Sequence, residues 1–453
     1  MRSEIQPRSL PHLQQLRLAA RQISLEGSRA VDSQTVTNDA LQKRGALAHT
    51  IEPYVDSKPI YVVTLGKAAL GMALTLNEKF GSSIRQGLCI SQRKPHPLNR
   101  SWQMFGGGHP VPNAQSLSAA KACIELFELA DKEQALIIFA VSGGGSAMFE
   151  CPANPEISLE DLQVANQVLV TCGASIAEVN AVRTAFSAVK GGKLAARAPN
   201  ARLVTLIISD TNPGDEASVA SGPTLVPMNS ELSAGEIVSK YDLEQHLPKT
   251  ILTAINSLST KVQPHPNATH FVLADNRSAV DAAAAEASHL GFRTVIADEI
   301  SEQEISDGCA QLLVRLKAEE PPVCLISGGE FSCPVRGEGR GGRNLETVLR
   351  CAMELDAEGD HIVILSEATD GVDGNSRVAG AIADNETTAR ASSLKLDASK
   401  FLSNSDSFGF LEALNDTFGQ GPTHTNVRDI RILLKTARDC EAGLNFQELF
   451  SLP

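Results

Sequence analysis

The sequence predicts an α/β protein of two domains whose sheets are mostly parallel. A chain of 453 residues is longer than one hydrophobic core usually serves. Short apolar runs typical of buried strands alternate with segments of helical spacing, which is the pattern of parallel sheets covered by helices on both faces. The Pro-rich stretch 264–267 lies between two such series and is typical of a linker. We therefore expect a Rossmann-like N-terminal α/β domain at residues 1–245 and a smaller C-terminal α/β domain at residues 246–453.

The first domain is expected to begin with helices at residues 11–49 and to reach its first buried strand at 59–65. Lys67 follows at the turn from this strand into a helix, where backbone N–H groups and a cation coincide. The strongest strand candidate, 135–141, leads straight into the glycine loop 142–146. The remaining elements expected here are strands at 88–91 and 203–208 and helices at 116–129, 158–172 and 175–197.

Strands of the second domain are expected at 270–274, 293–297, 323–326 and 361–366, with helices between them. The segment 323–346 combines a strand, six glycines, three arginines, the acids Glu330 and Glu346, and the start of a helix. Such a segment gathers backbone N–H groups and positive charge around an anion. A surface turn with solvated arginines explains this segment equally well when it is considered alone.

Polar or charged residues follow five of the expected strands. One such strand end has little significance, but five in one chain favour a binding site, because α/β sheets bind ligands at the carboxyl ends of their strands. The five ends are Gly66-Lys67, Ser142-Gly143-Gly144-Gly145-Ser146, Ser209-Asp210 with Asp215, Ser327-Gly328-Gly329-Glu330, and Thr369-Asp370 leading to Asp373.

These residue types together favour phosphoryl transfer. Lysine, arginine and glycine N–H groups bind phosphate or carboxylate. The carboxylates of Asp210, Asp215, Asp370 and Asp373 can hold Mg²⁺ or accept a proton from an attacking hydroxyl group. A cation, a carboxylate and a glycine loop are the groups that phosphoryl transfer requires, because positioning and charge neutralisation do most of its catalysis. For each aspartate considered alone, a turn or helix cap is the competing interpretation.

Three standard sequence signatures of nucleotide-binding proteins help to decide between a kinase and other functions. No GxxxxGK[ST] sequence exists, which excludes a P-loop, and the protein-kinase motifs are absent. Residues 337–342 match the GxGxxG pattern, which is typical of NAD(P)-dependent reductases. This fingerprint requires a buried strand directly before it, and Pro334 in the preceding segment disfavours such a strand. A non-catalytic anion-binding module also stays open from the residues alone.

Composition and charge limit the classes of molecule that the protein is expected to bind and the compartment in which it is expected to occur. A net charge of −13 argues against general nucleic-acid binding, which needs a basic face. No run approaches membrane-spanning length and the N-terminus has no apolar signal-sequence core. Nine scattered cysteines without a CxxC pair are typical of a cytoplasmic protein with reduced thiols. The sequence does not decide between a monomer and a homodimer.

Several long motifs resemble the glycerate 2-kinase family, whose C-terminal part is the MOFRL domain. The likeness extends in the family's order from the GKAA turn near residue 66 to about residue 430. The motifs are SGGGSAM, ISDTNPGDEASVASGPT, SGGE with RGEGRGGRNLE, ATDGVDG with AGAIAD, and GPTHTNV. The resemblance implies phosphorylation of D-glycerate at its 2-hydroxyl by ATP with Mg²⁺, in a cleft between two α/β domains.

The resemblance also implies roles for individual residues. Lys67 would bind the transferring phosphoryl group or the substrate carboxylate, Asp210 would act as base or organise Mg²⁺, and Arg343 would neutralise charge. Independently of the resemblance, the residue type of Asp215 and its place after a strand make it our expected metal ligand. The residues that would border nucleotide or substrate are Gly143, Gly144, Gly145, Ser146, Glu330, Asn344, Asp370 and Asn426.

The chain departs from the family pattern at three places. Ala185 stands where the family usually has histidine, Phe331 and Ser332 replace a common threonine pair, and His424 replaces a glycine. If the missing histidine contacts substrate, the acceptor is another small hydroxy acid. Some members carry the label hydroxypyruvate reductase, which is the dehydrogenase alternative named above.

Overall fold

A computed structural model describes residues 12–42, 45–94, 96–227, 233–257, 262–419, 421–438 and 444–445. Residue contacts divide the chain into two compact units. Unit 1 comprises residues 1–32, 274–423 and 427–453, and unit 2 comprises residues 33–273 and 424–426. The expectation that the chain has no signal sequence rests partly on residues 1–11. These residues lie outside the described part of the chain. Within the described residues, no helix is both long and apolar enough to cross a membrane.

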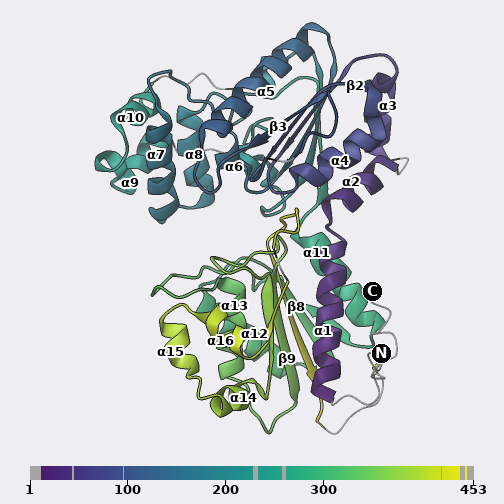
Figure 1. Ribbon diagram of the computed structural model, residues 1–453, viewed down its shortest axis with the longest axis vertical. Coiled ribbons are helices and arrows are strands. Elements are labelled where there is room, and N and C mark those ends of the chain that lie inside the picture. The colour runs from purple at the N-terminus through teal and green to yellow at the C-terminus, as the bar shows by residue number, and fades with distance from the viewer. Residues whose placement is uncertain are drawn as a thin grey trace. The chain divides into compact units, whose positions relative to one another are not determined.

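Unit 2 is organised around a six-stranded sheet. Its strands are β1 (Ile60–Leu65), β2 (Ile84–Ser91), β3 (Trp102–Gly106), β4 (Leu136–Ser142), β5 (Arg202–Ile208) and β6 (Ala268–Ala274). They lie in the order β3-β2-β1-β4-β5-β6 (Figure 1), and the β1–β2, β1–β4, β2–β3 and β4–β5 pairs are parallel. In a doubly wound sheet of this order the winding direction reverses between β1 and β4, and ligands bind outside the carboxyl ends of those strands.

Helices pack on this sheet, and a further group of helices forms a second core in the same unit. Phe127 and Phe139 pack edge to face, with ring centroids 6.1 Å apart, in the core between α5 and the sheet. The four helices α7 to α10 enclose a hydrophobic core of their own and group together in Figure 1. The helices are α2 (Ser33–Gln42), α3 (Ala46–Val55), α4 (Ala69–Phe80), α5 (Ala114–Lys132), α6 (Gly145–Met148), α7 (Leu159–Thr171), α8 (Ile176–Phe186), α9 (Ala234–Lys240) and α10 (Lys249–Ile255), with short 3₁₀ turns η2 (Gly81–Ser83), η3 (Ala195–Arg197), η4 (Glu216–Ser221) and η5 (Leu243–Gln245).

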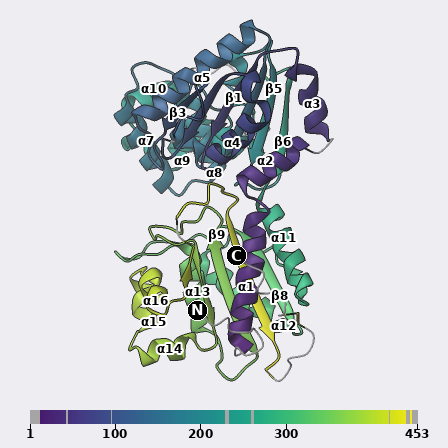
Figure 2. The same cartoon turned by 45° about the vertical axis from the view of Figure 1, so that its right-hand side comes forward.

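Unit 1 contains a second six-stranded sheet between two helical layers. Figures 1 and 2 show α1 and α11 side by side on one face, while α12 and α13 pack on the other. The sheet order is β11-β10-β9-β12-β8-β7. Its strands are β7 (Arg293–Ile296), β8 (Val323–Gly329), β9 (His361–Ala368), β10 (Gly380–Asp384), β11 (Thr417–Phe418) and β12 (Asp429–Thr436), and its helices are α1 (His12–Arg29), α11 (Asn276–His289), α12 (Ile305–Ala318), α13 (Arg343–Met353), α14 (Thr387–Ser393), α15 (Ala398–Ser403) and α16 (Ser407–Ala413).

The α/β fold is confirmed, but the expectation of a mostly parallel sheet is wrong for unit 1. Among the strand pairs described in this unit, only β7 and β8 are parallel. The last strand, β12, lies between β8 and β9 and is antiparallel to both, and β10 is antiparallel to β9 and β11. The strands β3, β10, β11 and β12 were not predicted, because a strand's neighbours in a sheet are not encoded in its own apolar pattern.

The boundary between the units also differs from the expected boundary at 245/246. Residues 246–273 belong to unit 2, because β6 lies beside β5 and α10 completes the core of α7 to α9. Arg202 Nη2 donates to Thr269 Oγ1 at 2.7 Å across the strands. The first helix belongs to unit 1, where α1 packs against α11, β9 and β12.

The helix expected at 175–197 is shorter than predicted. It ends at Phe186, and the chain then passes through Gly191 and Gly192, which have φ values of +62° and +80°. Glycine adopts this left-handed conformation without the steric cost of a Cβ, so the Lys190–Lys193 segment turns instead of continuing the helix.

Removal of the Arg17 side chain should destabilise unit 1. Arg17 Nη1 pairs with Asp384 at 2.6 Å and Nη2 pairs with Asp416, and the two carboxylates are almost fully buried. Arg17→Met would leave part of this buried charge uncompensated, and we expect a loss of about 1–3 kcal/mol in the free energy of unfolding, measured in urea. Arg29→Met on the same helix is the control, since its pair with Glu26 is exposed and should change stability by less than about 0.5 kcal/mol. Equal losses in the two variants would contradict this.

Candidate active site

The turn that carries Lys67 is joined by hydrogen bonds to the glycine loop. Lys67 N donates to Gly143 O at 3.0 Å, and Ala68 N donates to Ser142 Oγ at 2.9 Å. Gly66 has a φ of +109°, and a Cβ there would lie 2.5 Å from Ser142 Oγ and 2.9 Å from Gly143 O. Only glycine therefore permits β1 and β4 to end in contact, which fixes Lys67 at the point where the winding of the sheet reverses.

The glycine loop lies directly against Asp210, Asn426 and Lys67. A Cβ at Gly143 would collide with the Asp210 carboxylate and approach Asn426 Nδ2 to 2.6 Å. Asn426 Nδ2 donates to Asp210 Oδ2 at 3.2 Å. A Cβ at Gly144 would lie 3.2 Å from Lys67 Cγ. Backbone amides, a carboxylate and a lysine therefore meet at the carboxyl ends of β1, β4 and β5.

Ser146, the last residue of this loop, is held by hydrogen bonds. Its Oγ lies 2.8 Å from Ser221 Oγ, which in turn donates to Asn180 Oδ1 at 2.8 Å. The adjacent Gly145 is packed so closely that a Cβ would lie 2.7 Å from Ala220 Cβ. These contacts hold α6 against α8 and η4 and fix the conformation of the loop.

Asp215 is engaged in a turn. Its Oδ1 accepts a hydrogen bond from Ser218 Oγ at 2.7 Å, and its main-chain oxygen accepts from Thr211 Oγ1 at 3.1 Å. Among the residues that the structure describes, no group of three or more His, Cys, Asp and Glu side chains is arranged to hold a metal ion.

Glu330 and Arg343 of unit 1 form an ion pair. Arg343 Nη2 lies 2.6 Å from Glu330 Oε1, and Arg343 Nε lies 2.5 Å from Asp429 Oδ2. Asp429 is fully buried, whereas Glu330 is partly exposed. Burial opposes the charge on Arg343, but the carboxylates of Asp429 and Glu330 outweigh it and raise the pKa of the guanidinium.

Asn344 is buried and positions the start of α13. Its backbone N and its Nδ2 each donate to Asp373 Oδ1 at 3.1 Å, and its Oδ1 accepts from Ser366 Oγ at 2.6 Å. Leu345 N donates to the other Asp373 oxygen at 2.9 Å. Asp373 therefore caps α13 and orients the residue next to Arg343, while the Asn344 side chain is committed to contacts within the unit.

Asp370 lies in a loop joined to the segment before β12. Asp370 Oδ1 accepts from Val372 N at 3.1 Å, and its main-chain oxygen accepts from Thr423 N at 3.0 Å. The neighbouring Thr369 Oγ1 donates to Arg428 O at 2.6 Å. The ATDG and GPTHTNV motifs, far apart in sequence, thus meet through their main chains.

The structure gathers the predicted residues into two groups. The first, in unit 2, contains Lys67, the glycines 143–145, Asp210 and Asn426. The second, in unit 1, contains Glu330 and Arg343, with Asp429 as a partner that the sequence did not reveal. Asp429 is the second residue after the GPTHTNV motif, and only the position of β12 beside β8 shows that it reaches Arg343.

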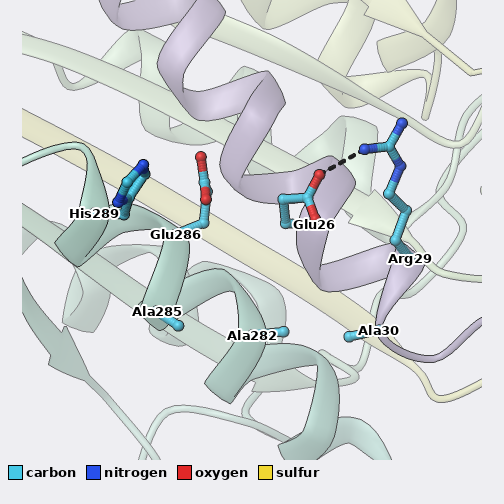
Figure 3. A pocket seen from close by; sticks show the side chains of 7 residues that line it. All are labelled: Glu26, Arg29, Ala30, Ala282, Ala285, Glu286 and His289. Atoms are coloured by element: carbon cyan, nitrogen blue, oxygen red, sulfur yellow. Dashed lines mark hydrogen bonds and ion pairs between the residues drawn. The ribbon is translucent and has the colours of Figure 1, made fainter. Parts of the chain in front are cut away.

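A surface depression between α1 and α11 contains none of the predicted residues. In Figure 3, Glu26 and Arg29 pair on α1, and Glu286 and His289 lie on α11. Its lining residues are Glu26, Arg29, Ala30, Ala282, Ala285, Glu286 and His289. It shares no side chain with either group of candidate residues.

Two protein families match the chain. The family described as a domain of unknown function (DUF4147) matches residues 19–256, and the MOFRL family matches residues 323–429. A glycerate 2-kinase of Pyrococcus horikoshii is 32% identical over 84% of this chain and 88% of its own length. A putative hydroxypyruvate reductase of Agrobacterium vitis is 35% identical over 82% of this chain and 98% of its own length.

The fold is shared with a solved structure. The crystal structure of a glycerate kinase from Thermotoga maritima superposes with a TM-score of 0.77 at 29% identity, and the match covers 94% of this chain and 100% of that one. The likeness therefore includes both units, and every candidate residue lies within the extent of the family's motifs.

Gly66→Ala should destabilise unit 2 much more than alanine at an unobstructed glycine with positive φ. Gly66 combines a φ of +109° with the close oxygens of Ser142 and Gly143, whereas Gly173 has a φ of +79° and nothing within 4 Å of the place that a Cβ would occupy. We expect Gly173→Ala to cost about 1 kcal/mol from backbone strain alone and Gly66→Ala at least about 2 kcal/mol more. Urea unfolding followed by fluorescence would measure both. Similar costs would show that contact between the two loops is unimportant.

Asp373 should make stability depend on pH. Burial raises its pKa to about 6 from the ordinary value of 3.8, although hydrogen bonds from Leu345 N and Asn344 partly oppose the shift. Between pH 4 and 6 the folded chain therefore binds a proton that the unfolded chain lacks, so the contribution of Asp373 falls as pH rises through this window. The melting temperature of wild type minus that of Asp373→Asn should fall from pH 4 to pH 6 and then stay constant. A difference independent of pH would refute this assignment.

Proposed function

This chain belongs to the glycerate 2-kinase family, and from that premise we propose that it phosphorylates the 2-hydroxyl of D-glycerate with ATP and Mg²⁺. The observation that carries the proposal is the meeting of Lys67, the glycine loop and Asp210 where the winding of the sheet reverses. These are the groups that bind, orient and neutralise a transferring phosphoryl group.

Asp210 is our proposed general base. A carboxylate can accept the proton of the 2-hydroxyl as that oxygen attacks the γ-phosphorus of ATP. Asn426 donates to Asp210 Oδ2 and so fixes the orientation of the carboxylate. The absence of a side chain on Gly143 lets this carboxylate lie directly against the loop, within reach of a ligand bound there.

We propose that the protein holds Mg²⁺ in the manner usual for nucleotide-dependent kinases. Such sites take one or two carboxylates, and nucleotide phosphate oxygens supply further ligands, so the lack of a larger acidic cluster in the described residues agrees with them. When bound, the ion would neutralise charge on the phosphates. Asp215 stays a predicted ligand, although its carboxylate already accepts a hydrogen bond from Ser218.

Lys67 and the loop N–H groups are proposed to bind the phosphates. The side chain of Lys67 extends over Gly144 and supplies a compact positive charge to the γ-phosphoryl group. Neutralising charge that develops in the transition state lowers the barrier more than it strengthens ground-state binding. Ser146, bonded to Ser221, would keep the loop in its binding conformation.

Arg343 is proposed to bind an anionic oxygen by exchanging one partner. Asp429 is buried and would keep its contact with Nε, while the more exposed Glu330 would yield Nη2 to a phosphate or carboxylate. The guanidinium retains its charge throughout because its pKa is raised. Asn344 and Asp370 would act on the same group indirectly, by fixing the start of α13 and the adjacent loop.

An NAD(P)-dependent reductase is the alternative suggested by the Agrobacterium vitis relative. The GxGxxG at 337–342 lies in a loop, since β8 ends at Gly329 and α13 begins only at Arg343. Gly337 and Gly339 pack against residues 404–406 instead. A dinucleotide fingerprint requires these glycines at the strand-to-helix turn itself, so the kinase has the better structural support.

An assay of ADP release across small hydroxy acids tests the function. We expect D-glycerate to stimulate ADP release and hydroxypyruvate to cause no oxidation of NADH. Turnover of NADH, or ATP binding without release of ADP for any acid, would exclude the kinase.

Replacement of the three proposed catalytic residues should lower kcat with the fold intact. We expect Lys67→Ala, Asp210→Asn and Arg343→Ala each to reduce kcat by at least about 10²-fold, the scale of losing one electrostatic contact in the transition state. Lys79→Ala is a matched control, because Lys79 is exposed on α4, the helix that follows Lys67. Unchanged kcat in all three variants would refute the site.

A further inference from the structure

Arg183 is a buried cation that the catalytic proposal leaves unused. It lies on α8 and is 9% exposed. Its Nη2 donates to Asn166 Oδ1 at 2.7 Å. No carboxylate among the described residues forms an ion pair with it. A buried guanidinium without a carboxylate is costly to desolvate, so its retention calls for an anion from outside the chain.

The surroundings of Arg183 carry an excess of positive charge. Glu150 is the carboxylate that acts on it electrostatically, but this group is already paired with Lys190 and accepts from Ser187 Oγ and Cys151 N. The nearby Lys193 donates to two main-chain oxygens. Burial lowers the pKa of Arg183, and the charge of Glu150 only partly offsets this. The carboxylate of Glu150 is therefore shared electrostatically by three cations, Arg183, Lys190 and Lys193.

Asn166 connects Arg183 to the loop beside Lys67. Asn166 Nδ2 donates to Pro110 O at 2.7 Å, and the preceding residue is His109. A Cβ at Gly144 would lie 3.4 Å from His109 Cδ2 and 3.2 Å from Lys67 Cγ. The guanidinium of Arg183 is thus linked to the glycine loop through Asn166 and the segment 109–110, all within unit 2.

From this we infer that Arg183 binds the carboxylate of the acid substrate, which leaves Lys67 to the phosphoryl group. The inference rests on the proposed function and deepens it by assigning the part of the site that selects acids over neutral polyols. Arginine suits this task because its planar fork donates two parallel hydrogen bonds to a carboxylate. Asn166 would set the orientation of the fork.

The decisive measurement is binding of D-glycerate by isothermal titration calorimetry, together with steady-state kinetics. For Arg183→Gln we expect the Kd and KM for glycerate to rise about 10–100-fold, with the KM for ATP within about twofold of wild type. Arg183→Lys should have an intermediate effect, since it keeps the charge but not the fork. Arg197→Gln is the matched control, because Arg197 is exposed and its ion pair with the exposed Glu128 is long, at 3.6 Å. Glycerol should not bind detectably to any of these proteins.

Two substitutions at Asn166 test the same idea without removal of the arginine. Asn166→Asp would place a carboxylate beside the guanidinium, where it competes with the substrate, and Asn166→Ala would leave the guanidinium without this partner and without added charge. Both variants lose the hydrogen bond from Asn166 Nδ2 to Pro110 O. We expect the Kd for glycerate to be at least about 10-fold higher in Asn166→Asp than in Asn166→Ala. This pair decides the question if Arg183→Gln does not fold.

The outcomes separate this inference from the proposed function. Normal glycerate affinity in Arg183→Gln, or equal affinities in the two Asn166 variants, would overturn the carboxylate assignment while kinase activity stands. Arginine-dependent binding of glycerate without any ADP release would support the assignment and overturn the kinase. A wild-type protein that neither binds nor phosphorylates glycerate would overturn both.

Discussion

Two hydrogen bonds join the turn after β1 to the loop after β4, one from Lys67 N to Gly143 O and one from Ala68 N to Ser142 Oγ. They exist because β1 and β4 are parallel neighbours that end level with each other, with Leu65 opposite Val141. The constraint needs a glycine at residue 66, since any side chain there would overlap the second loop. A lysine, a set of loop backbone amides and, through β5, the Asp210 carboxylate are consequently held at one edge of the sheet.

The two units handle buried charge in different ways. In unit 1, Arg343 is matched by the carboxylates of Asp429 and Glu330, one buried and one partly exposed, so an anionic ligand has a partner to displace. In unit 2, the hydrogen-bond partner of Arg183 is the neutral amide of Asn166, so an anion would complete the site. An arginine paired with carboxylates keeps its positive charge through the reaction. An arginine whose hydrogen-bond partner is neutral instead favours binding of an anionic substrate. This contrast is the physical basis for assigning catalysis and substrate selection to different arginines.

Buried polar residues also fix the loops that carry the candidate side chains. Asp373 caps α13 through Asn344 and Leu345, and Ser221 connects Ser146 to Asn180. Arg431 is fully buried, stacks over Phe331 at 3.8 Å and donates to main-chain oxygens at the end of β8, and its burial lowers its pKa to about 10. Networks of this kind hold a site within the small tolerances that phosphoryl transfer demands.

The sequence by itself determined the α/β class, most strands of the first sheet, and the places where Lys67, the glycine loop and Asp210 follow strand ends. Those features depend on local apolar periodicity and on the conformational freedom of glycine, which neighbouring residues encode. Only the tertiary structure decided that β12 enters between β8 and β9, that α1 packs with unit 1, that Asp429 reaches Arg343, and that Arg183 is buried beside a neutral amide. Each of these depends on contacts between residues far apart in the chain, and the apolar pattern of a segment does not specify which distant segment will cover it.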